Sequence, residues 1–360
     1  MRVVKIVAVQ AVIATLLLEG LLRAFNPLPS VLHGDRISLP LGVRFRRHNP
    51  PDPRLDPITI ETRNSLGFRG PEPPADFRSR LSIIAVGGST TEDAALTDGK
   101  SWPEVLGTIL SSDHPETWVN NAGFNGHSTT GHLVLLRSVL VTLKPSMLLL
   151  AGVNDIGLAS DPTTNEFDMP GEGRPWQRLA RHSEAASTFL NLFRVWRASQ
   201  MAFPRIDLLD FSSLAQRDLT DEEIAARTAP LTTHLGDYDA RLTALATEAR
   251  RAGIAPVFLT QPTLVGDAID PATGLDLRRL VQEDDGNLNG LALWRLLETY
   301  NDVMRRNAAA QGVPLIDLAR QLPKDSRLYC DFIHFSNAGA RAVAAIVAAG
   351  LEPYLVRPGG

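Results

Sequence analysis

The sequence has little of what marks several large classes of protein. Only one of its 360 residues is cysteine, Cys330, so no disulfide can form within the chain and no cysteine zinc cluster is available. The formal net charge is −4, and no basic field of the kind that nucleic acids require is present. No repeat of fixed period occurs, which excludes a solenoid. We therefore expect no nucleic-acid partner.

Metal and cofactor motifs are also missing. The eight histidines show neither HxH nor HExxH spacing, and His127 with His132 is one residue away from the usual helical ligand pair. Neither the phosphate-binding GxxxxGK[ST] pattern nor the dinucleotide-binding GxGxxG pattern follows the first expected strand. We expect no metal and no cofactor.

One long apolar run is present, at the amino terminus. Residues 1–25 carry Arg2 and Lys5, followed by a mostly apolar stretch that Gln10 and Glu19 interrupt. A helix needs about 20 residues to span a bilayer, which this segment just reaches, and no clear cleavage site follows it. We interpret it as an uncleaved signal anchor, with the rest of the chain on the extracytoplasmic, periplasmic side. An amphipathic helix packed on the main domain is the alternative, and basic residues on both flanks leave the orientation open.

The remainder of the chain changes character at residue 81. Residues 26–80 are rich in proline and arginine, which favours an extended tether with one short folded patch. From 81 to 360, apolar runs of strand length alternate with helical periodicity, which predicts a parallel sheet covered on both faces. The expected fold class is α/β, a doubly wound, flavodoxin-like three-layer α/β/α domain. Its five strands are expected at 81–86, 117–122, 146–151, 255–260 and 313–318.

One interval interrupts this alternation between the third and fourth expected strands. Residues 157–237, with approximate bounds, contain no strong signal for a parallel strand but include a helical stretch. An insertion near the strand ends could serve as a lid or a substrate platform. We therefore treat it as a helical insertion in the main domain.

Polar and glycine-rich segments follow four of the strands. Ligands of open α/β sheets bind outside the carboxyl ends of the strands, so these segments are expected to share one rim. They are GGST with Ser89, NAGFNG with Gly126, GVND with Asn154, and DFIH with Asp331 and His334. Each alone could be a turn or a helix cap. Together they supply a hydroxyl nucleophile, an imidazole base, a carboxylate and N–H donors for an oxyanion.

In these four blocks and in their order, the chain resembles the SGNH hydrolases, the superfamily of GDSL-type esterases and lipases. The resemblance covers about 81–354 and leaves the expected anchor and tether outside. It implies that Ser89 is the nucleophile, that His334 is the base and that Asp331 is its partner. It also implies an oxyanion hole made by the amide of Ser89 together with Gly126 and Asn154.

The chain departs from the family pattern at one position. The common GDS is here GGS, with Gly88 in place of the acid, as in bacterial membrane-anchored members, which this chain resembles. The NSLGFRG and TQPT segments, at 64–70 and 260–263, are similar to the same branch. The candidate pocket residues around the four blocks are Gly88, Thr90, Gly123, His127 and Asp155.

The resemblance implies a serine esterase that hydrolyses carboxylic esters through an acyl-enzyme. The acyl group would be O-acetyl or longer, on a small molecule, a lipid or a glycan. An alternative uses the same residues to move an acyl group onto a cell-envelope glycan. A non-catalytic binding protein on the same fold is a second alternative, although all four blocks retain their chemical groups.

Overall fold

The computed structural model describes most of the chain. The described residues are 2–25, 32–33, 36–37, 39, 41–152, 154–158, 183–185, 188, 208–281 and 288–355. They fall into two compact units, one of 1–40 with 161–205 and a larger one of 41–160 with 206–360. Of the predicted insertion at 157–237, residues 159–182, 186–187 and 189–207 lie outside the described residues.

Five parallel strands form the central sheet of the larger unit, which confirms the predicted α/β fold class. The spatial order is β11-β9-β7-β5-β6. The chain runs from β5 outward to β6 and then returns to β7 on the other side of β5, so a topological switch point lies at β5. The strands are β5 (Leu81–Gly87), β6 (Thr117–Gly123), β7 (Met147–Ala151), β9 (Ala255–Leu259) and β11 (Leu315–Ile316).

Four of the five expected strands agree with the structure to within one residue at each end. The fifth, expected at 313–318, is reduced to the two residues of β11, which pair only with β9. It is an edge strand, and the chain turns into a short helix directly after Asp317. The apolar run at 313–318 is therefore longer than the strand within it, because an edge strand has a hydrogen-bonding partner on one side only.

Helices cover both faces of this sheet. The described helices of the larger unit are α2 (Ser89–Glu92), α3 (Trp102–Asp113), α4 (Thr129–Leu135), α5 (Val141–Leu143), α8 (Asp221–Thr228), α9 (Leu235–Arg251), α10 (Gly290–Gln311), α11 (Leu318–Gln321) and α12 (Asn337–Leu351). A π-helical turn joins α4 to α5. The short strands β8 (Ala215–Gln216) and β10 (Leu280–Val281) pair with each other as a separate antiparallel sheet of two strands.

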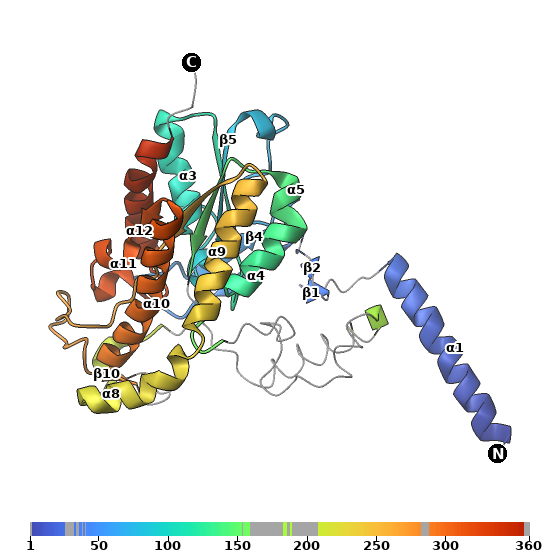
Figure 1. The fold of residues 1–360 in the computed structure, drawn as a ribbon, viewed down its shortest axis with the longest axis horizontal. Coiled ribbons are helices and arrows are strands. Elements are labelled where there is room, and N and C mark those ends of the chain that lie inside the picture. Colours follow the sequence, from blue (N-terminus) through green and yellow to red (C-terminus); the bar gives the residue numbers. More distant parts are fainter. Residues whose placement is uncertain are drawn as a thin grey trace. The chain divides into compact units, whose positions relative to one another are not determined.

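Alternation along the strands divides the core between the two faces. Ile83, Leu149 and Val257 form one apolar cluster with Leu106 of α3 and Val347 of α12. The residues between them on the strands are also buried and point to the opposite face. There α9 packs against both α4 and α10 (Figure 1). The layers are thus α3 and α12, the sheet, and α4, α9 and α10.

Side-chain caps mark where the long helices begin. Ser101 and Glu104 form a capping box at the start of α3. Asn289 accepts a hydrogen bond from the amide of Ala292 at 3.0 Å at the start of α10, and Ser336 caps α12. Each cap satisfies an amide that the helix itself leaves without a partner, so these polar residues set the helix boundaries.

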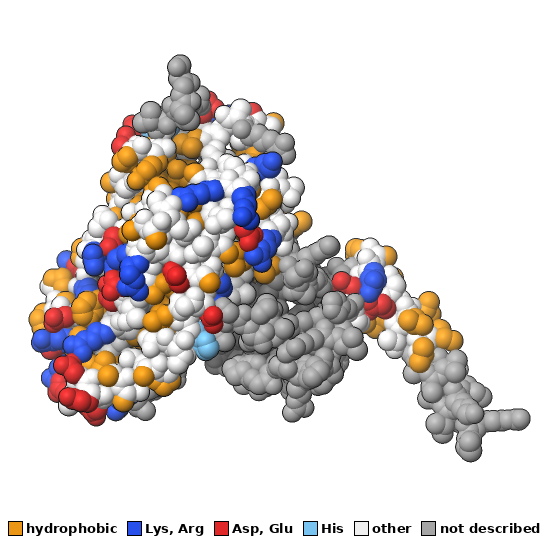
Figure 2. All heavy atoms as spheres, in the orientation of Figure 1, with side chains coloured by type: hydrophobic (Ala, Val, Ile, Leu, Met, Phe, Trp, Pro, Cys, Tyr) orange, Lys and Arg blue, Asp and Glu red, His pale blue; other side chains and the backbone are white. Residues whose placement is uncertain are grey.

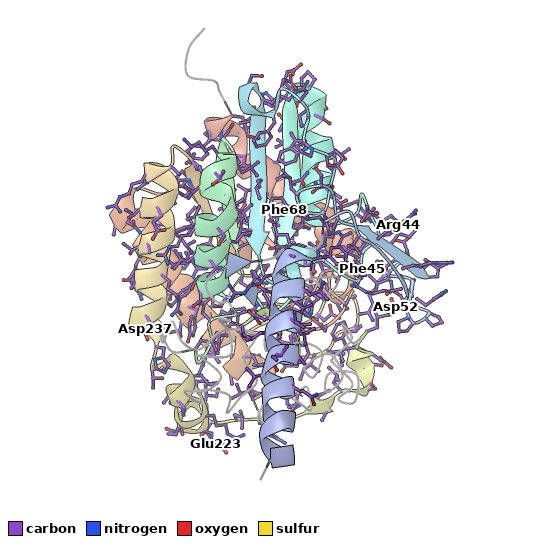
Figure 3. All side chains as sticks on the ribbon, turned by 90° about the vertical axis from the view of Figure 1, so that its right-hand side faces the viewer. Arg44, Phe45, Asp52, Phe68, Glu223 and Asp237 are labelled. Atoms are coloured by element: carbon purple, nitrogen blue, oxygen red, sulfur yellow. The ribbon has the colours of Figure 1, made fainter. Side chains whose placement is uncertain are left out.

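The segment at 58–70, where one short folded patch was expected, forms a strand and a turn, but the expected tether is folded over more of its length than that patch. From Leu41 onward it belongs to the larger unit, where β3 (Arg44–His48) and β4 (Ile58–Thr62) form an antiparallel ribbon. Figure 3 shows Phe68 beside the central sheet, whereas Phe45 lies on the ribbon. Phe68 has no exposed surface and Phe45 is 37% exposed. A composition rich in proline and arginine does not show that a single residue of the segment, such as Phe68, is buried.

The smaller unit contains α1 (Arg2–Ala24) and the short antiparallel strands β1 (Leu32–His33) and β2 (Arg36–Ile37). The structure does not support the predicted membrane-spanning segment: within the part of the chain that it describes, no helix is both long and apolar enough to cross a bilayer.

On the face of the larger unit shown in Figure 2, acidic and basic side chains are interspersed.

Candidate active site

Two glycines precede Ser89 because neighbouring side chains lie against the backbone there. Ser89 is the first residue of α2, which begins directly after β5. A Cβ atom on Gly87 would lie 2.1 Å from Oγ1 of Thr91, and one on Gly88 would lie 2.1 Å from Nδ2 of Asn154. A larger residue would displace these groups. The glycines therefore allow the start of α2 to lie against the turn that follows β7.

Three side chains that the sequence places far apart form one hydrogen-bonded chain. Nε2 of His334 lies 2.8 Å from Oγ of Ser89, and its Nδ1 lies 2.5 Å from Oδ2 of Asp331. Oδ1 of Asp331 accepts hydrogen bonds from the amides of Ile333 at 2.8 Å and His334 at 2.7 Å. The turn that carries the imidazole thus also orients the carboxylate beside it. A serine nucleophile with a base and an orienting acid has this geometry.

The electrostatics of the pair favour a charged imidazole. Burial opposes protonation of His334, but the Asp331 carboxylate and its hydrogen bond outweigh burial and raise the pKa of His334 above its usual 6.5. Burial likewise acts to raise the pKa of Asp331, yet attraction to His334 and hydrogen bonds lower it below 3.8. Both shifts stabilise an imidazolium–carboxylate pair of His334 and Asp331.

The three predicted oxyanion donors come from three segments. The amide of Ser89 lies at the N-terminus of α2, where helix amides have no partner within the helix. Nδ2 of Asn154 lies against Gly88 and donates to the carbonyl of His127 at 3.0 Å. Gly126, the residue before His127, is exposed, has a φ of +77°, and has open space where a Cβ would stand. The structure therefore brings Asn154 next to the nucleophile and places Gly126 in the loop that Asn154 contacts.

A buried ionic network supports the turn that carries Asn154. The carboxylate of Asp155 has no exposed surface and accepts hydrogen bonds from the amide of Thr129 at 3.1 Å and from Nη2 of Arg241 at 2.9 Å. Oγ1 of Thr129 also donates to it, and Nε of Arg241 donates to that hydroxyl at 2.7 Å. Burial raises the pKa of Asp155, and Thr129 and Arg241 oppose the rise. The network joins the turn to α4 and α9.

The five candidate pocket residues are all buried: Gly88, Thr90, Gly123, His127 and Asp155. Oγ1 of Thr90 donates to Oε1 of Gln261 at 2.8 Å. A Cβ on Gly123 would lie 2.3 Å from the amide of Glu92. Burial, with a smaller effect of His132, lowers the pKa of His127 to about 3, so this ring is neutral. Because all five are buried, none of them offers an exposed surface to a substrate.

Several supporting residues were not assigned a role from the sequence. Gln261 lies in the TQPT segment, whose family resemblance was the only signal for it. Arg63 and Arg69 flank the NSLGF part of the other such segment, and both are buried beside α2. Arg241 had no signal at all, because one arginine on an amphipathic helix resembles any other. Contacts across the fold identify these residues.

The chemistry that the site supports is nucleophilic. A serine hydroxyl, an imidazole, a carboxylate and N–H donors are the components of a serine hydrolase. Among the described residues, no three His, Cys, Asp or Glu side chains come together as a candidate metal site.

The sequence comparison agrees with this class. Residues 85–342 match the model of the GDSL-like lipase/acylhydrolase family. The match covers well over half of the chain, so the protein belongs to this family, within the SGNH hydrolase superfamily. It is an ester-hydrolysing serine hydrolase. No curated protein matches the sequence.

Solved structures provide a distant likeness. Axe2, an acetylxylan esterase from Geobacillus stearothermophilus, is 15% identical with a TM-score of 0.41, over 76% of this chain and 94% of that one. TesA is 15% identical with a TM-score of 0.41, over 76% and 99% of the two chains. A putative lipolytic protein of the G-D-S-L family from Desulfitobacterium hafniense is 12% identical with a TM-score of 0.39, over 76% and 100%.

Proposed function

We propose that this protein hydrolyses carboxylic esters through an acyl-enzyme formed on Ser89. The observation that carries the proposal is the 2.8 Å contact between Oγ of Ser89 and Nε2 of His334. A hydroxyl is a weak nucleophile at neutral pH, and a base at hydrogen-bond distance is what activates it. Asp331 holds the other ring nitrogen, so Nε2 faces the hydroxyl as the unprotonated nitrogen.

The reaction proceeds in two halves. Nε2 of His334 takes the proton of Ser89 as Oγ attacks the ester carbonyl carbon, and the carbonyl oxygen becomes an oxyanion. When this intermediate collapses, the C–O bond to the alcohol breaks and His334 returns the proton to the alcohol. Water then attacks the acyl-enzyme with His334 again as base. The carboxylic acid leaves and Ser89 regains its proton.

The oxyanion is stabilised by donors that are already in place. The amides of Ser89 and Gly126 and Nδ2 of Asn154 are the proposed donors. Each such donor contributes about 10²–10³ in rate in enzymes of this kind. The buried network of Asp155 with Thr129 and Arg241 holds the Asn154 turn in place before substrate arrives.

The substrate class is an O-acyl or O-acetyl ester of a small molecule, a lipid or a glycan. Acyl transfer to a glycan uses the same acyl-enzyme and stays a prediction, as does attachment of the chain to a membrane with the catalytic unit outside the cytoplasm. Product analysis with a glycan acceptor distinguishes the two reactions. Transfer requires that acyl-glycan form faster than free acid.

The decisive experiment is covalent labelling with a fluorophosphonate probe. Wild-type protein is expected to be labelled, and Ser89→Ala is expected to be unlabelled and to lose about 10⁶-fold in kcat on an ester that the wild type cleaves. Ser112→Ala is the matched control, since Ser112 is exposed on α3. It should retain wild-type labelling.

The outcome that rejects the proposal is equally clear. If Ser89→Ala is labelled or turns over an ester at the wild-type rate, Ser89 is not the nucleophile. A panel of esters with acyl chains of graded length then defines the acyl group for the confirmed enzyme.

A further inference from the structure

Two arginines outside the family-matched residues are buried against the nucleophile helix. Arg63 is 3% exposed and Arg69 has no exposed surface, and both precede residue 85, where the family match begins. A bridge pairs their backbones antiparallel, and the turn between them contains Gly67 with a φ of +80°. Phe68, at the same turn, has no exposed surface and lies beside the central sheet (Figure 3). The turn is therefore fixed in the core.

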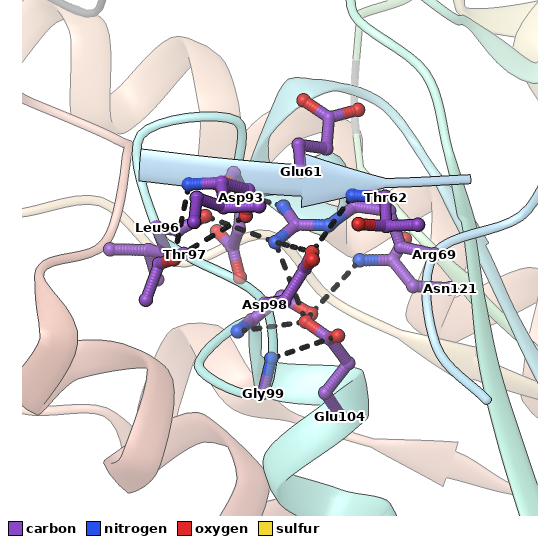
Figure 4. Close-up of polar contacts among 12 residues, drawn as sticks. Glu61, Thr62, Arg69, Asp93, Leu96, Thr97, Asp98, Gly99, Glu104 and Asn121 are labelled. Atoms are coloured by element: carbon purple, nitrogen blue, oxygen red, sulfur yellow. Dashed lines mark hydrogen bonds and ion pairs between the residues drawn. The ribbon is translucent and has the colours of Figure 1, made fainter. Parts of the chain in front are cut away.

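Arg69 binds the carbonyl groups at the end of the nucleophile helix. Its Nη1 donates to the carbonyls of Glu92 at 2.6 Å and Asp93 at 2.9 Å, and its Nη2 donates to that of Leu96 at 3.0 Å (Figure 4). The last carbonyls of a helix have no partner within it, and α2 is a single turn. Asp93 also has a φ of +52°, a region that non-glycine residues rarely adopt. The guanidinium therefore stabilises a short and strained turn that begins with Ser89.

The same arginine is joined to the neighbouring strand. The backbones of Arg69 and Asn121, on β6, exchange two hydrogen bonds of 2.9 Å. Nδ2 of Asn121 donates to the carbonyl of Thr91 at 2.6 Å, and the carboxylate of Glu104 lies 3.5 Å from the guanidinium (Figure 4). The position of the nucleophile turn is thus set relative to β6, the strand that leads to the proposed oxyanion loop.

Arg63 connects the nucleophile helix to that loop directly. Its Nη2 pairs with the carboxylate of Glu92, and its Nε donates to Glu61 at 2.7 Å. Its Nη1 donates to the carbonyl of Gly123 at 3.3 Å, and the guanidinium lies over the ring of Phe124, 5.0 Å from the ring centre. Gly123 and Phe124 begin the loop that carries the proposed donor Gly126.

We propose that Arg63 and Arg69 are positioning residues that align Ser89 with the oxyanion loop. This inference rests on the proposed function. Two buried guanidinium groups are a costly way to stabilise a fold, because apolar side chains of similar size are often as good or better. Their planar donors match several carbonyl oxygens at once, which a lysine cannot do. Neither side chain reaches Ser89 in any contact of the structure, so they act through the backbone of α2.

The test compares Arg69→Lys and Arg63→Lys with the control Arg44→Lys, which changes an exposed arginine on β3. For folded variants of either buried arginine, we expect kcat on the ester to fall by about 10²-fold with KM unchanged, as misplaced reacting groups produce. The rate of fluorophosphonate labelling should fall by the same factor. Hydrogen exchange at the amides of 89–96 should accelerate in both variants and not in the control.

The possible results separate this inference from the proposed function. A folded lysine variant with wild-type kcat overturns the inference, and if Arg69→Lys does not fold, Arg63→Lys decides alone. If the wild type shows no turnover that depends on Ser89, the esterase proposal fails and this inference fails with it. If turnover depends on Ser89 but exchange at 89–96 and kcat are both unchanged in the folded lysine variants, the esterase proposal stands and only this inference is overturned.

Discussion

At the scale of single residues, the proposed reaction depends on the charge of His334. In that proposal the ring must be neutral to accept the proton of Ser89. Burial disfavours the charged ring, but Asp331 beside it and the carboxyl groups of Asp93 and Glu92 favour it, and the pKa rises above 6.5. Burial raises the pKa of Asp93 to about 8, and Asp93 contributes less than Asp331 to the raised pKa of His334.

The raised pKa predicts the pH dependence of hydrolysis. Because the neutral ring is the active form, kcat/KM should fall as the pH drops through the pKa of His334, with a midpoint above 6.5. Asp331→Asn should move this midpoint to lower pH and reduce the plateau by about 10⁴-fold. A pH–rate profile of both proteins provides the measurement. An unmoved midpoint would show that another group controls the acidic limb.

Gly88 offers a steric test of the proposed oxyanion hole. Gly88→Ala places a methyl group 2.1 Å from Nδ2 of Asn154, so the amide must move away. We expect kcat to fall by about 10²-fold or more, as loss of one donor does, with a smaller change in KM. Gly236→Ala is the control, because no atom lies within 4 Å of its added methyl group. Equal kcat values for the two variants would exclude a role for Asn154.

At the scale of elements, the site depends on how loops are attached to helices. The turn after β7 is held to α4 and α9 by the buried ion pair of Asp155 and Arg241, with Thr129 between them. Helices contribute apolar faces to the core, but these polar contacts set the orientation of the turn. The effect of such a buried ion pair on stability is largest when one partner is removed, because the other charge is then left buried alone.

Removal of one partner predicts a large loss of stability. Arg241→Met leaves the carboxylate of Asp155 buried without its charged partner, which should lower the free energy of unfolding by about 3–5 kcal/mol. Arg251→Met, at an exposed position at the end of the same helix, should change it by less than about 0.5 kcal/mol. Denaturant unfolding measures both. Similar midpoints for the two variants would contradict this account.

At the scale of the whole larger unit, the residues of the candidate site come from segments that lie far apart in the sequence. Ser89 follows the central strand β5 at the switch point of the sheet, whereas His334 and Asp331 precede α12 near the end of the chain. The segment from 41 to 80 contacts residues near each of them: Arg69 binds the carbonyl of Glu92, at the end of the turn that begins with Ser89, and Arg54 donates to the carbonyl of Tyr329, two residues before Asp331, at 3.1 Å. This segment therefore packs against the segments that carry the candidate site.

Truncation tests that boundary. A chain that begins at Leu41 should retain wild-type labelling by fluorophosphonate, because it keeps the larger unit complete. A chain that begins at Leu81 loses Arg54, Arg63 and Arg69 and leaves buried carbonyls without partners, each at a cost of about 1–3 kcal/mol. Because total stability is about 5–15 kcal/mol, we expect it to unfold or to lose labelling. Equal stability of the two chains would disprove the assignment.

The fold and the residues of the candidate site could both be predicted from the sequence, but for different physical reasons. The strand at 147–151 is a continuous apolar run, and the strand at 81–87 contains Ser82 as its one polar residue, as expected for a sheet buried on both faces. The candidate site was predicted because chemical groups at strand ends must share one rim. The shortness of the edge strand β11 and the packing of 41–80 beyond one folded patch were not predicted, since both depend on neighbours that no local pattern reveals.

By itself, the sequence determined the α/β class, the order of the strands along the chain and the chemical groups available at their ends, because periodicity and residue type are local properties. Only the tertiary structure decided that Ser89 and His334 lie 2.8 Å apart, that Asp155 pairs with Arg241, and that Arg63 and Arg69 enclose the nucleophile turn. These contacts join residues remote along the chain, and burial, which makes each polar pairing obligatory, exists only after the core has formed.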